Sequence, residues 1–401
     1  MPRVLRILNR LIIGGPLLNA AYLTKYMAPE FETLLITGGK EDHEKDASFI
    51  TSQLDIHFLN VPEMGRSINL QKDYQAYKKI KKIIKDFKPD IVHTHAAKPG
   101  AVGRLAANSM KIPVIVHTYH GHVFHSYFNK LKTKFIIHIE RSLAKKTDAI
   151  IAISEQQLKE LSGEFKIAPE NKFRIIPLGL DLDKFQSDSD IKRSKFRKEF
   201  NIKDDEIVIT IVGRLAPVKN HKLFLDALSQ VLKRSNKKIR AFVVGDGETK
   251  TALQKQATSL GISFSMETDS LHNSPLIFTS WRNDIDVINA GSDIIALSSF
   301  NEGTPVSLIE AQAANKPVIS TRVGGIQDIV LENETALLSE SNDVNGFSEN
   351  LLRLIQDDAL RHMLGKKGFD FVLQKFSYQR LVKDMASLYN ELLDRKRKNV
   401  F

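Results

Sequence analysis

Apolar segments of strand length recur along the chain, with helical patterns between most of them. In the first half they cover residues 4–8, 34–37, 91–95, 114–118, 150–154 and 173–177. In the second half they cover residues 207–212, 241–245, 276–280, 294–299 and 318–321. Strands that alternate with helices are typical of parallel α/β units. The pattern therefore predicts two Rossmann-like domains, each a doubly wound parallel sheet.

A charged, weakly apolar stretch, residues 181–205, separates the two sets of strands and indicates the domain boundary. We predict an N-terminal domain over residues 1–182, a C-terminal domain over 183–375 and a helical final segment over 376–401. Ligands of open parallel sheets bind outside the carboxyl ends of the strands, so two such domains facing each other would form a cleft. The polar segment Leu260 to Leu276 does not fit the strand pattern.

Composition supports this division. A chain of 401 residues with 42% hydrophobic content can bury two ordinary cores. It contains no Cys, which fits a reducing compartment. The apolar run Leu11-Ile12-Ile13 follows three arginines, but Gly14-Gly15-Pro16 ends it far short of the roughly 18 residues that a membrane span needs. We expect a soluble, cytoplasmic protein.

The chain is basic, with 58 Lys and Arg against 47 Asp and Glu and a net charge of +11. Such a balance favours anionic partners. Two stretches, Tyr77 to Lys88 and Asn129 to Lys146, combine lysines with apolar residues at helical spacing. Either could lie on an anionic membrane surface, on the inner face of the cell membrane, or be a packed helix with a solvated face. No zinc-finger, RNP-type or basic-zipper signature occurs, so no nucleic-acid partner is expected.

The most informative stretch follows the strand at 294–299. Glu302 and Glu310 bracket the run EGTPVSLIE, in which the chain must turn from a strand into a helix. Thr304 is predicted to cap this helix and Pro305 to occupy its first turn. Free N–H groups and the positive helix end would then face the carboxyl edge of the sheet, where an anion such as phosphate is expected.

Two carboxylates beside a phosphate site would repel the ligand unless they met its neutral hydroxyl groups. A sugar or a ribose supplies such hydroxyls, so the stretch predicts a pocket for a sugar nucleotide. The alternative is a surface acid in a loop and a solvated acid on a helix.

Basic residues follow the first strand of the second half, in the run GRLAPVKNH. Arg214 and Lys219 at a strand's carboxyl end suit a diphosphate, and their charges would make a divalent cation unnecessary. By themselves they would be two ordinary surface cations. In the N-terminal domain, Gly14-Gly15-Pro16 opens a helical pattern, which predicts either a close backbone approach to a ligand or a simple tight turn.

Histidines cluster at the ends of two predicted strands of the first half or just after them, namely His93, His95, His117, His120, His122 and His125. Near neutral pH an imidazole can donate to or accept from a phosphate or sugar oxygen. No HExxH run or Cys partner accompanies them, so no metal site is expected. Asp181-Leu182-Asp183 and Asp284-Ile285-Asp286 match the DxD pattern of metal-dependent sugar transferases, but neither follows a strand clearly.

Four runs together resemble the family 4 retaining glycosyltransferases of the GT-B fold, especially bacterial members that build cell-surface polysaccharides. They are EGTPVSLIEAQAANKPVISTRVGGIQDIV, GRLAPVKNH, VGDGE and PLGLDLDKF. The resemblance implies transfer of a hexose or N-acetylhexosamine from a nucleotide sugar, UDP-linked in most such enzymes, to a lipid-linked or glycan acceptor, without a metal or other cofactor. It also implies that the N-terminal domain holds the acceptor and that the final helix crosses back to that domain.

The resemblance assigns roles to individual residues. Glu310 would bind the ribose, Glu302 the transferred sugar, and His120 would lie next to the reacting sugar. Arg214 and Lys219 would hold the diphosphate. The remaining donor-binding positions are Gly14, Gly15, Gly303, Thr304, Pro305 and Val306, some through backbone amides. The family pattern is altered at IQDIV and at Leu260 to Leu276, which affects loop geometry and donor choice.

Other functions of the same architecture stay open on sequence alone. A sugar-nucleotide epimerase would release a changed nucleotide sugar without an acceptor, and a phosphorylase would carry a cofactor lysine, for which no candidate is found. A non-catalytic sugar-nucleotide-binding protein, or a scaffold that uses its basic helices, would not turn over a donor at all.

Overall fold

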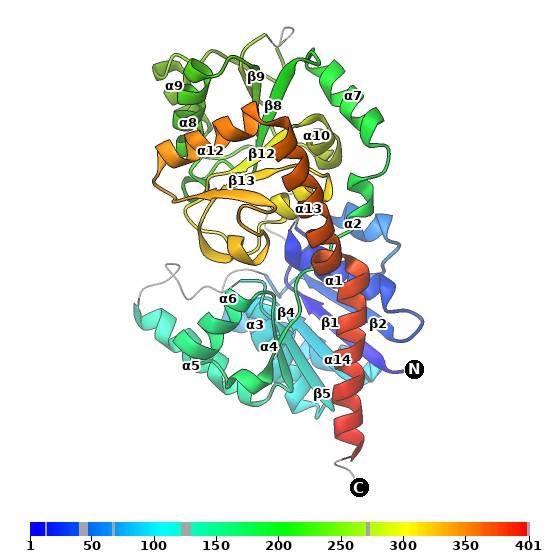
Figure 1. Cartoon of the computed structure of the whole chain (residues 1–401). Coiled ribbons are helices and arrows are strands. Elements are labelled where there is room, and N and C mark those ends of the chain that lie inside the picture. Colours follow the sequence, from blue (N-terminus) through cyan, green and yellow to red (C-terminus); the bar gives the residue numbers. More distant parts are fainter. Residues whose placement is uncertain (13, 40–46, 66–68, 122–129, 270–272, 399–401) are drawn as a thin grey trace. The chain divides into compact units, whose positions relative to one another are not determined.

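The computed structural model describes residues 1–12, 14–39, 47–65, 69–121, 130–269 and 273–398 (Figure 1). Its internal contacts divide the chain into two compact units. The first contains Met1–Leu180 and Phe376–Phe401, and the second contains Asp181–Lys375. The break therefore falls where the charged stretch begins, and the C-terminal helix belongs to the N-terminal unit.

The N-terminal unit is built on a seven-stranded parallel sheet with the order β3-β2-β1-β4-β5-β6-β7. Its strands are β1 (Arg3–Leu8), β2 (Glu32–Gly38), β3 (Phe58–Val61), β4 (Ile91–His95), β5 (Val114–Thr118), β6 (Ala149–Ala152) and β7 (Phe173–Ile175). Its α-helices are α1 (Gly15–Tyr26), α2 (Ser48–Gln53), α3 (Leu70–Phe87), α4 (Ala97–Ser109), α5 (Lys130–Lys145), α6 (Glu155–Leu158) and α14 (Tyr378–Lys398). A π-helix, Lys159–Glu164, and a 3-10 helix, Glu170–Lys172, follow α6.

Helices cover both faces of this sheet. On one face, Leu23 of α1 and the apolar stripe of α14, including Leu381 and Tyr389, pack on the central strands. On the other face, Ile80 of α3 and Ala106 of α4 do so. Helix α14 thus supplies part of the core of the N-terminal unit, although it comes from the far end of the chain (Figure 1).

The C-terminal unit repeats the plan with the order β10-β11-β9-β8-β12-β13-β14, again parallel throughout. Its strands are β8 (Glu206–Val212), β9 (Lys238–Val244), β10 (Phe264–Met266), β11 (Leu276–Phe278), β12 (Ile294–Leu297), β13 (Val318–Thr321) and β14 (Ala336–Ser339). Its α-helices are α7 (Ser189–Glu199), α8 (His221–Arg234), α9 (Lys250–Ser259), α10 (Ile285–Gly291), α11 (Val306–Ala313), α12 (Val344–Gln356) and α13 (Asp358–Phe376). Short 3-10 helices cover Asp183–Phe185, Pro217–Lys219 and Gly324–Asp328.

Here too the sheet is covered on both sides. Leucines and a phenylalanine of α8, together with residues of α9 and α12, form the core on one face. Phe196 of α7 and Ile288 of α10 pack on Phe242 of β9 on the other. Within the described ranges, no helix is both long enough and apolar enough to cross a membrane.

The predicted parallel α/β fold is confirmed, and all eleven predicted strands are present. Three strands were missed: β3, β10 and β14, each at the outer edge of its sheet. Strands β3 and β10 are only partly buried, so they lack the continuous apolar run that identifies a central strand. Strand β10 lies in the segment Leu260 to Leu276, which therefore contains regular structure.

Candidate functional site

Hydrogen bonds join two loops at the carboxyl edge of the C-terminal sheet. The N–H of Phe300, after β12, donates to the carbonyl of Val218, after β8, at 2.8 Å. The hydroxyl of Ser298 donates to the carbonyl of Asn220 at 2.9 Å. Because β8 and β12 are neighbours in the sheet, these bonds hold the GRLAPVKNH and EGTPVSLIE runs against each other.

The joined loops bring Lys219 and Glu302 into direct contact. Nζ of Lys219 lies 2.6 Å from Oε1 of Glu302, and the hydroxyl of Ser299 donates to the same oxygen at 2.5 Å. The Glu302 side chain is 8% exposed and that of Lys219 is 26% exposed. A partly buried ion pair therefore links the residue predicted to hold the diphosphate with the residue predicted to hold the sugar.

Gly324 and Gly325 pack against the backbone of the loop that carries Glu302. The sequence analysis assigned neither glycine a role. Gly325 donates its N–H to the carbonyl of Glu302 at 3.0 Å. A Cβ on Gly324 would lie 2.0 Å from that carbonyl oxygen, and Gly324 has φ +49°, a region that favours glycine. A Cβ on Gly325 would lie 1.9 Å from the carbonyl oxygen of Gly303. The Gly-Gly pair after β13 could have indicated this backbone contact from the sequence.

Helix α11 begins one residue later than predicted. Pro305 is its N-cap residue, with φ −70° and ψ 108°, and no side chain caps the helix. The predicted cap by Thr304 is therefore wrong, because Thr304 lies one position before the cap. The N–H groups of Val306 and Ser307, the first two of α11, have no intrahelical partner, as at any helix start, whereas that of Leu308 donates to the carbonyl of Pro305 at 3.2 Å. The anion site predicted at this helix start therefore depends on backbone N–H groups alone.

Glu310, the fifth residue of α11, is half-buried. Within the described part of the chain its carboxylate has no hydrogen bond or ion pair. Burial raises the pKa of Glu310 to about 7, with Lys184 acting in the opposite direction and Asp286 adding repulsion. An unpaired carboxylate of this kind can accept hydrogen bonds from a diol and becomes charged near neutral pH.

Arg214 lies in a different setting from Lys219. Its guanidinium is 65% exposed and pairs with Glu248, itself 51% exposed, at 3.2 Å. Among the residues described, it forms no ion pair with Glu302. Exposed pairs of this kind contribute little to stability, so the guanidinium can exchange Glu248 for a phosphate at low cost. The structure thus joins Lys219 to Glu302 and leaves Arg214 on a separate surface pair.

The VGDGE run fixes the loop that carries Arg214. Leu215 donates its N–H to the carbonyl of Asp246 at 2.9 Å. A Cβ on Gly245, which has φ +142°, would lie 2.0 Å from the carbonyl oxygen of Gly213. Only glycine permits this close approach of the two backbones, which explains the glycine without requiring a dinucleotide-type fingerprint.

In the N-terminal unit, the predicted glycine turn opens a helix. Gly15 and Pro16 lie in the first turn of α1, and the carbonyl of Gly14 accepts from Leu18 N–H at 3.3 Å. The turn follows β1, so it lies at the carboxyl side of the N-terminal sheet. Its roles in binding remain predictions.

The fully buried His93, His95 and His117 of β4 and β5 form a group with the partly buried His120, which follows β5. His95 Nδ1 lies 3.0 Å from His120 Nε2, His93 Nδ1 lies 2.6 Å from the hydroxyl of Tyr389, and His117 Nδ1 lies 2.8 Å from Thr94 Oγ1. Burial is the main reason that the pKa values of His93, His95 and His117 lie well below the usual range, and it lowers the pKa of His120 to about 3.

Metal ligation receives no support from these groups. Across the described residues, no set of three His, Cys, Asp or Glu side chains is arranged to hold a metal ion. His122 and His125 lie outside the described residues. In the second DxD match, Asp284 is bonded through both oxygens to Arg282, and Asp286 pairs with Lys192 at 2.9 Å. These carboxylates are used in ion pairs.

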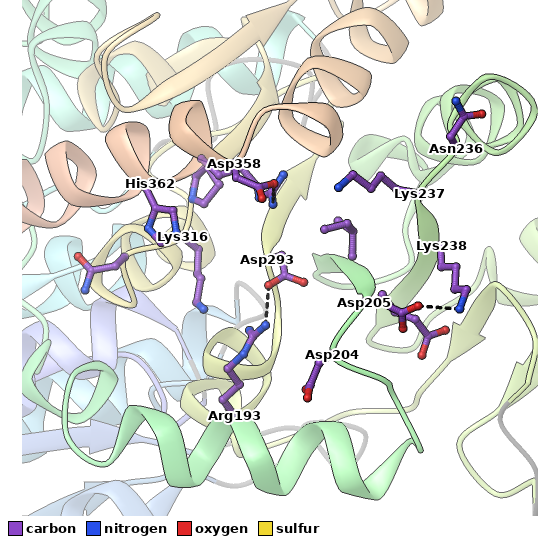
Figure 2. Close-up of a pocket in the computed structure, with 15 residues that line it drawn as sticks. Arg193, Asp204, Asp205, Asn236, Lys237, Lys238, Asp293, Lys316, Asp358 and His362 are labelled. Carbon is purple, nitrogen blue, oxygen red and sulfur yellow. Dashed lines mark hydrogen bonds and ion pairs between the residues drawn. The ribbon is translucent and has the colours of Figure 1, made fainter.

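A pocket of about 710 Å³ lies at the other edge of the C-terminal sheet (Figure 2). It is lined by residues at the amino ends of β8, β9, β12 and β13, whereas Lys219 and Glu302 follow the carboxyl ends of β8 and β12. Its charged residues neutralise one another: Arg193 pairs with Asp293 at 2.9 Å and Lys238 with Asp205 at 2.6 Å. This pocket does not belong to the candidate site.

Two family models match the chain. Residues 14–184 match glycosyltransferase family 4, and residues 192–371 match glycosyl transferases group 1. A galactosyltransferase of Escherichia coli, named UDP-Gal:alpha-D-GlcNAc-diphosphoundecaprenol alpha-1,3-galactosyltransferase, is 31% identical over 88% of this chain and 89% of its own length. The capsular polysaccharide biosynthesis glycosyltransferase CapM of Staphylococcus aureus is 30% identical over 85% and 87%, respectively.

Solved structures agree in fold. A glycosyltransferase from Rickettsia africae superposes with a TM-score of 0.79 at 21% identity, covering 98% of both chains. HepE of Anabaena, solved in complex with UDP, also gives 0.79, at 19% identity over 97% of this chain and all of its own. With both halves matched by family models and two relatives at or above 30% identity, the chain belongs to the family 4 (group 1) glycosyltransferases and is an enzyme of that class.

Proposed function

We propose that this enzyme transfers a hexose or N-acetylhexosamine, with retention of configuration, from a UDP-sugar to a lipid-linked or glycan acceptor in cell-surface polysaccharide synthesis. Support comes from the contact between Lys219 and Glu302 beside the start of α11, where a cation, free backbone N–H groups and a carboxylate converge. The E. coli relative uses UDP-galactose and a diphosphoundecaprenol-linked sugar by its name, so UDP-galactose is the first donor to test.

Each of the site residues binds one part of the nucleotide-sugar donor. Lys219, Arg214 and the backbone of Gly303 to Val306 hold the diphosphate. Glu310, which has no partner among the described residues, accepts hydrogen bonds from the ribose. In the N-terminal unit, Gly14 and Gly15 offer backbone amides to phosphate oxygens, and His120 meets a hydroxyl of the transferred sugar, as the family resemblance implies.

In the structure, Glu302 occupies the ammonium of Lys219, so this carboxylate competes with the donor's diphosphate for that ammonium. A diphosphate that binds Lys219 must take the ammonium from Glu302, and the carboxylate is then left to accept from a sugar hydroxyl. Both groups are partly desolvated, so each needs a partner before and after the exchange. The exchange couples diphosphate binding to sugar binding.

In the transfer itself, the bond between the sugar's anomeric carbon and the UDP oxygen breaks, and UDP leaves with the electron pair. The acceptor hydroxyl forms the new bond on the same face, and its proton passes to the departing phosphate. Positive charge on Lys219 and Arg214 and the N-terminal end of α11 stabilise the leaving group, which is the usual source of rate in such sites. These cations would replace a divalent metal, so activity should persist in EDTA.

The basic helices of the N-terminal unit suit an anionic membrane surface. On α5, Leu131 is 80% and Phe135 66% exposed, and the exposed Lys132 and Lys134 lie between them in the chain. On α3, Leu70 and Tyr74 are exposed, and Lys78 lies over the Tyr74 ring at 4.6 Å. Helix α4 packs against both α3 and α5. Apolar side chains surrounded by lysines are what interfacial binding requires, and we place the enzyme at the cytoplasmic membrane face.

Flotation with liposomes tests this location. Binding should require anionic lipid, weaken as salt increases, and weaken further when Leu131 and Phe135 are both replaced by Gln. Replacing the equally exposed Ile191 of α7 by Gln is the matched control and should have no effect. Protein that stays at the bottom of the gradient with every lipid would exclude membrane docking.

A donor panel tests the reaction. The enzyme is incubated with UDP-galactose, UDP-glucose, UDP-N-acetylglucosamine and GDP-mannose, each with and without a membrane extract, and the products are identified by mass spectrometry. Release of nucleoside diphosphate with a sugar-extended lipid, only when extract is present, is expected. A changed nucleotide sugar formed without extract would indicate an epimerase, and no turnover of any donor would indicate a binding protein.

A further inference from the structure

A fully buried arginine in the N-terminal unit has no carboxylate partner among the residues that the structure describes. Arg6 of β1 is 0% exposed, and its guanidinium bonds only to uncharged groups: Thr24 Oγ1 at 3.1 Å, Met27 Sδ at 3.5 Å and the hydroxyl of Tyr389 at 3.3 Å. Within the described ranges no acid reaches it. The sheet register places Arg6 beside His93, so this permanent cation lies next to the histidine group.

The hydrogen bonds from Arg6 fix the proton on His93. Because a guanidinium can only donate, the Tyr389 oxygen accepts from Arg6 and donates its own proton to His93 Nδ1, 2.6 Å away. His93 must then carry its proton on Nε2, which lies 2.7 Å from Thr118 Oγ1 and donates to it. Helix α14, through Tyr389, therefore sets the state of a histidine on β4.

His93 in turn packs against the pair formed by His95 and His120. The rings of His93 and His95 are 4.1 Å apart, and those of His95 and His120 are stacked at 5.3 Å. His95 Nδ1 and His120 Nε2 share one hydrogen bond of 3.0 Å. The remaining nitrogens, His95 Nε2 and His120 Nδ1, are buried and have no partner in the described part of the molecule.

Among the described residues, the charged side chains that act on these histidines disfavour an imidazolium. They are Arg6 from β1 and, behind His117, Arg104 from α4, whose charge is balanced by Glu140 of α5 at 2.6 Å. From α14, the neutral Tyr389 contacts His93. After burial, the neighbouring histidines and Arg6 lower the pKa of His95 further. His95 and His120 are therefore both neutral and hold one proton each.

Two arrangements of those protons are compatible with the shared bond. In one, His120 donates to His95, and the fully buried His95 keeps an unpaired Nε2–H in the interior. In the other, His95 donates to His120, and the less buried His120 keeps an Nδ1–H on the side away from His95. Either arrangement leaves one buried N–H without an acceptor among the described residues, and such groups are rare in proteins. Because residue His120 is partly exposed whereas His95 is 0% exposed, the N–H of His120 is the one that can gain an acceptor from a bound substrate, which favours the second arrangement.

We propose that His95 is a positioning residue for His120: it donates Nδ1–H to His120 Nε2 and thereby leaves His120 with an Nδ1–H that donates to an oxygen of the sugar substrate. The substrate side of this inference rests on the proposed function, whereas the proton arrangement does not. The hydrogen bonds from Arg6 to Tyr389 and from Tyr389 to His93 fix the His93 ring, on which His95 packs. They thereby help to hold His95 in place.

The test begins with the free protein, labelled with ¹⁵N-histidine. NMR at pH 7.5 should show His120 as the neutral Nδ1–H tautomer in the wild type and in His95→Asn, whose side-chain amide can replace the Nδ1 donor. In His95→Leu the Nδ1–H tautomer should no longer predominate. The exposed His57, replaced by Leu, is the matched control and should leave the His120 signals unchanged.

Transfer kinetics provide the second measurement. His95→Leu should lower kcat by about tenfold, the equivalent of one lost hydrogen bond, with the KM for donor little changed, and His95→Asn should recover most of that loss. Tyr389→Phe should give a smaller decrease, and Tyr378→Phe on the same helix none. An Nε2–H tautomer of His120 in the wild type, or equal kcat for the Leu and Asn variants, would overturn the proposal. Failure of the proposed function alone would abolish turnover but leave the NMR result intact.

Discussion

The ammonium of Lys219 lies 2.6 Å from a carboxylate oxygen of Glu302, although the two residues come from different loops of the C-terminal unit. The pair is held by hydrogen bonds between the loops, not only by its own charges. Because the cation proposed to bind phosphate is paired with the carboxylate proposed to bind the sugar, replacing either partner should have a different effect.

Loss of the cation should chiefly affect the chemical step. Lys219→Ala removes a positive charge from a partly desolvated leaving group, and kcat should fall by about 10²- to 10³-fold. Circular dichroism and the unfolding temperature should stay near the wild-type values. Lys219→Arg, which keeps the charge, should retain more activity than Ala. A kcat for Lys219→Ala close to the wild type would contradict the assigned role.

Loss of the carboxylate should separate nucleotide binding from transfer. In Glu302→Gln, Lys219 has no anionic partner and binds a diphosphate without competition, so calorimetry should show tighter UDP binding, by a few-fold. Transfer should nevertheless be slower, because the contact with the sugar hydroxyl is weakened. Weaker UDP binding in this variant would show that Glu302 does not compete for Lys219.

Glu310 predicts a pH dependence for nucleotide binding. Its folded-state pKa is raised to about 7, so the carboxyl is mainly protonated below that pH and ionised above it. Ribose hydroxyls donate better to the ionised form, so UDP affinity should increase as the pH rises from 6 to 8 and then level off. The phosphate of UDP also titrates, and Glu310→Gln serves as the control because it keeps that contribution.

Calorimetry of both proteins at several pH values isolates the Glu310 effect. The wild type should gain more affinity than Glu310→Gln between pH 6 and 8, and Glu310→Ala should bind UDP more weakly throughout. Parallel curves for wild type and Glu310→Gln would remove the ribose assignment.

The glycine pair after β13 can be tested without altering a charge. Gly324→Ala would place a Cβ 2.0 Å from the Glu302 carbonyl oxygen at a φ of +49°, so the Glu302 loop must shift. Transfer should fall at least as much as in Glu302→Gln, and the unfolding temperature should decrease, because the left-handed φ alone costs about 1–2 kcal/mol and the clash with a backbone oxygen adds to it. Gly213→Ala, whose Cβ would meet nothing within 4 Å, is the control at the same sheet edge. Equal activity of the two variants would contradict the structural role.

Much of the fold was predictable because central parallel strands are buried on both faces. The run Ile207 to Val212 is apolar at all but one position, as expected for a strand in a sheet that helices cover on both faces. Edge strands such as β3 and β10 have one solvated side, and nothing in their few residues distinguishes them from loops. The start of α11 was misplaced by one residue because Thr304 and Pro305 both fit a helix start, and backbone geometry chose between them.

The candidate site was likewise predictable from the sequence only in part. The residue types and the spacing of EGTPVSLIE were enough to predict a strand, a turn and a helix with two acids. The spacing could not show that Lys219 contacts Glu302 while Arg214 pairs with Glu248, since each pairing depends on which loops the sheet order makes neighbours. It also gave no reason to connect Arg6, His93 and Tyr389, which are separated by most of the chain.

By itself, the sequence determined the parallel α/β architecture, the family and the short runs that carry the chemistry, because local apolar periodicity and turn residues are physical properties of neighbours in the chain. The tertiary structure alone decided which charges are paired, which carboxylate stays without a partner among the described residues, and which groups the histidine nitrogens contact. Those properties depend on burial and on contacts between distant segments, and both arise only when the sheets and their covering helices pack.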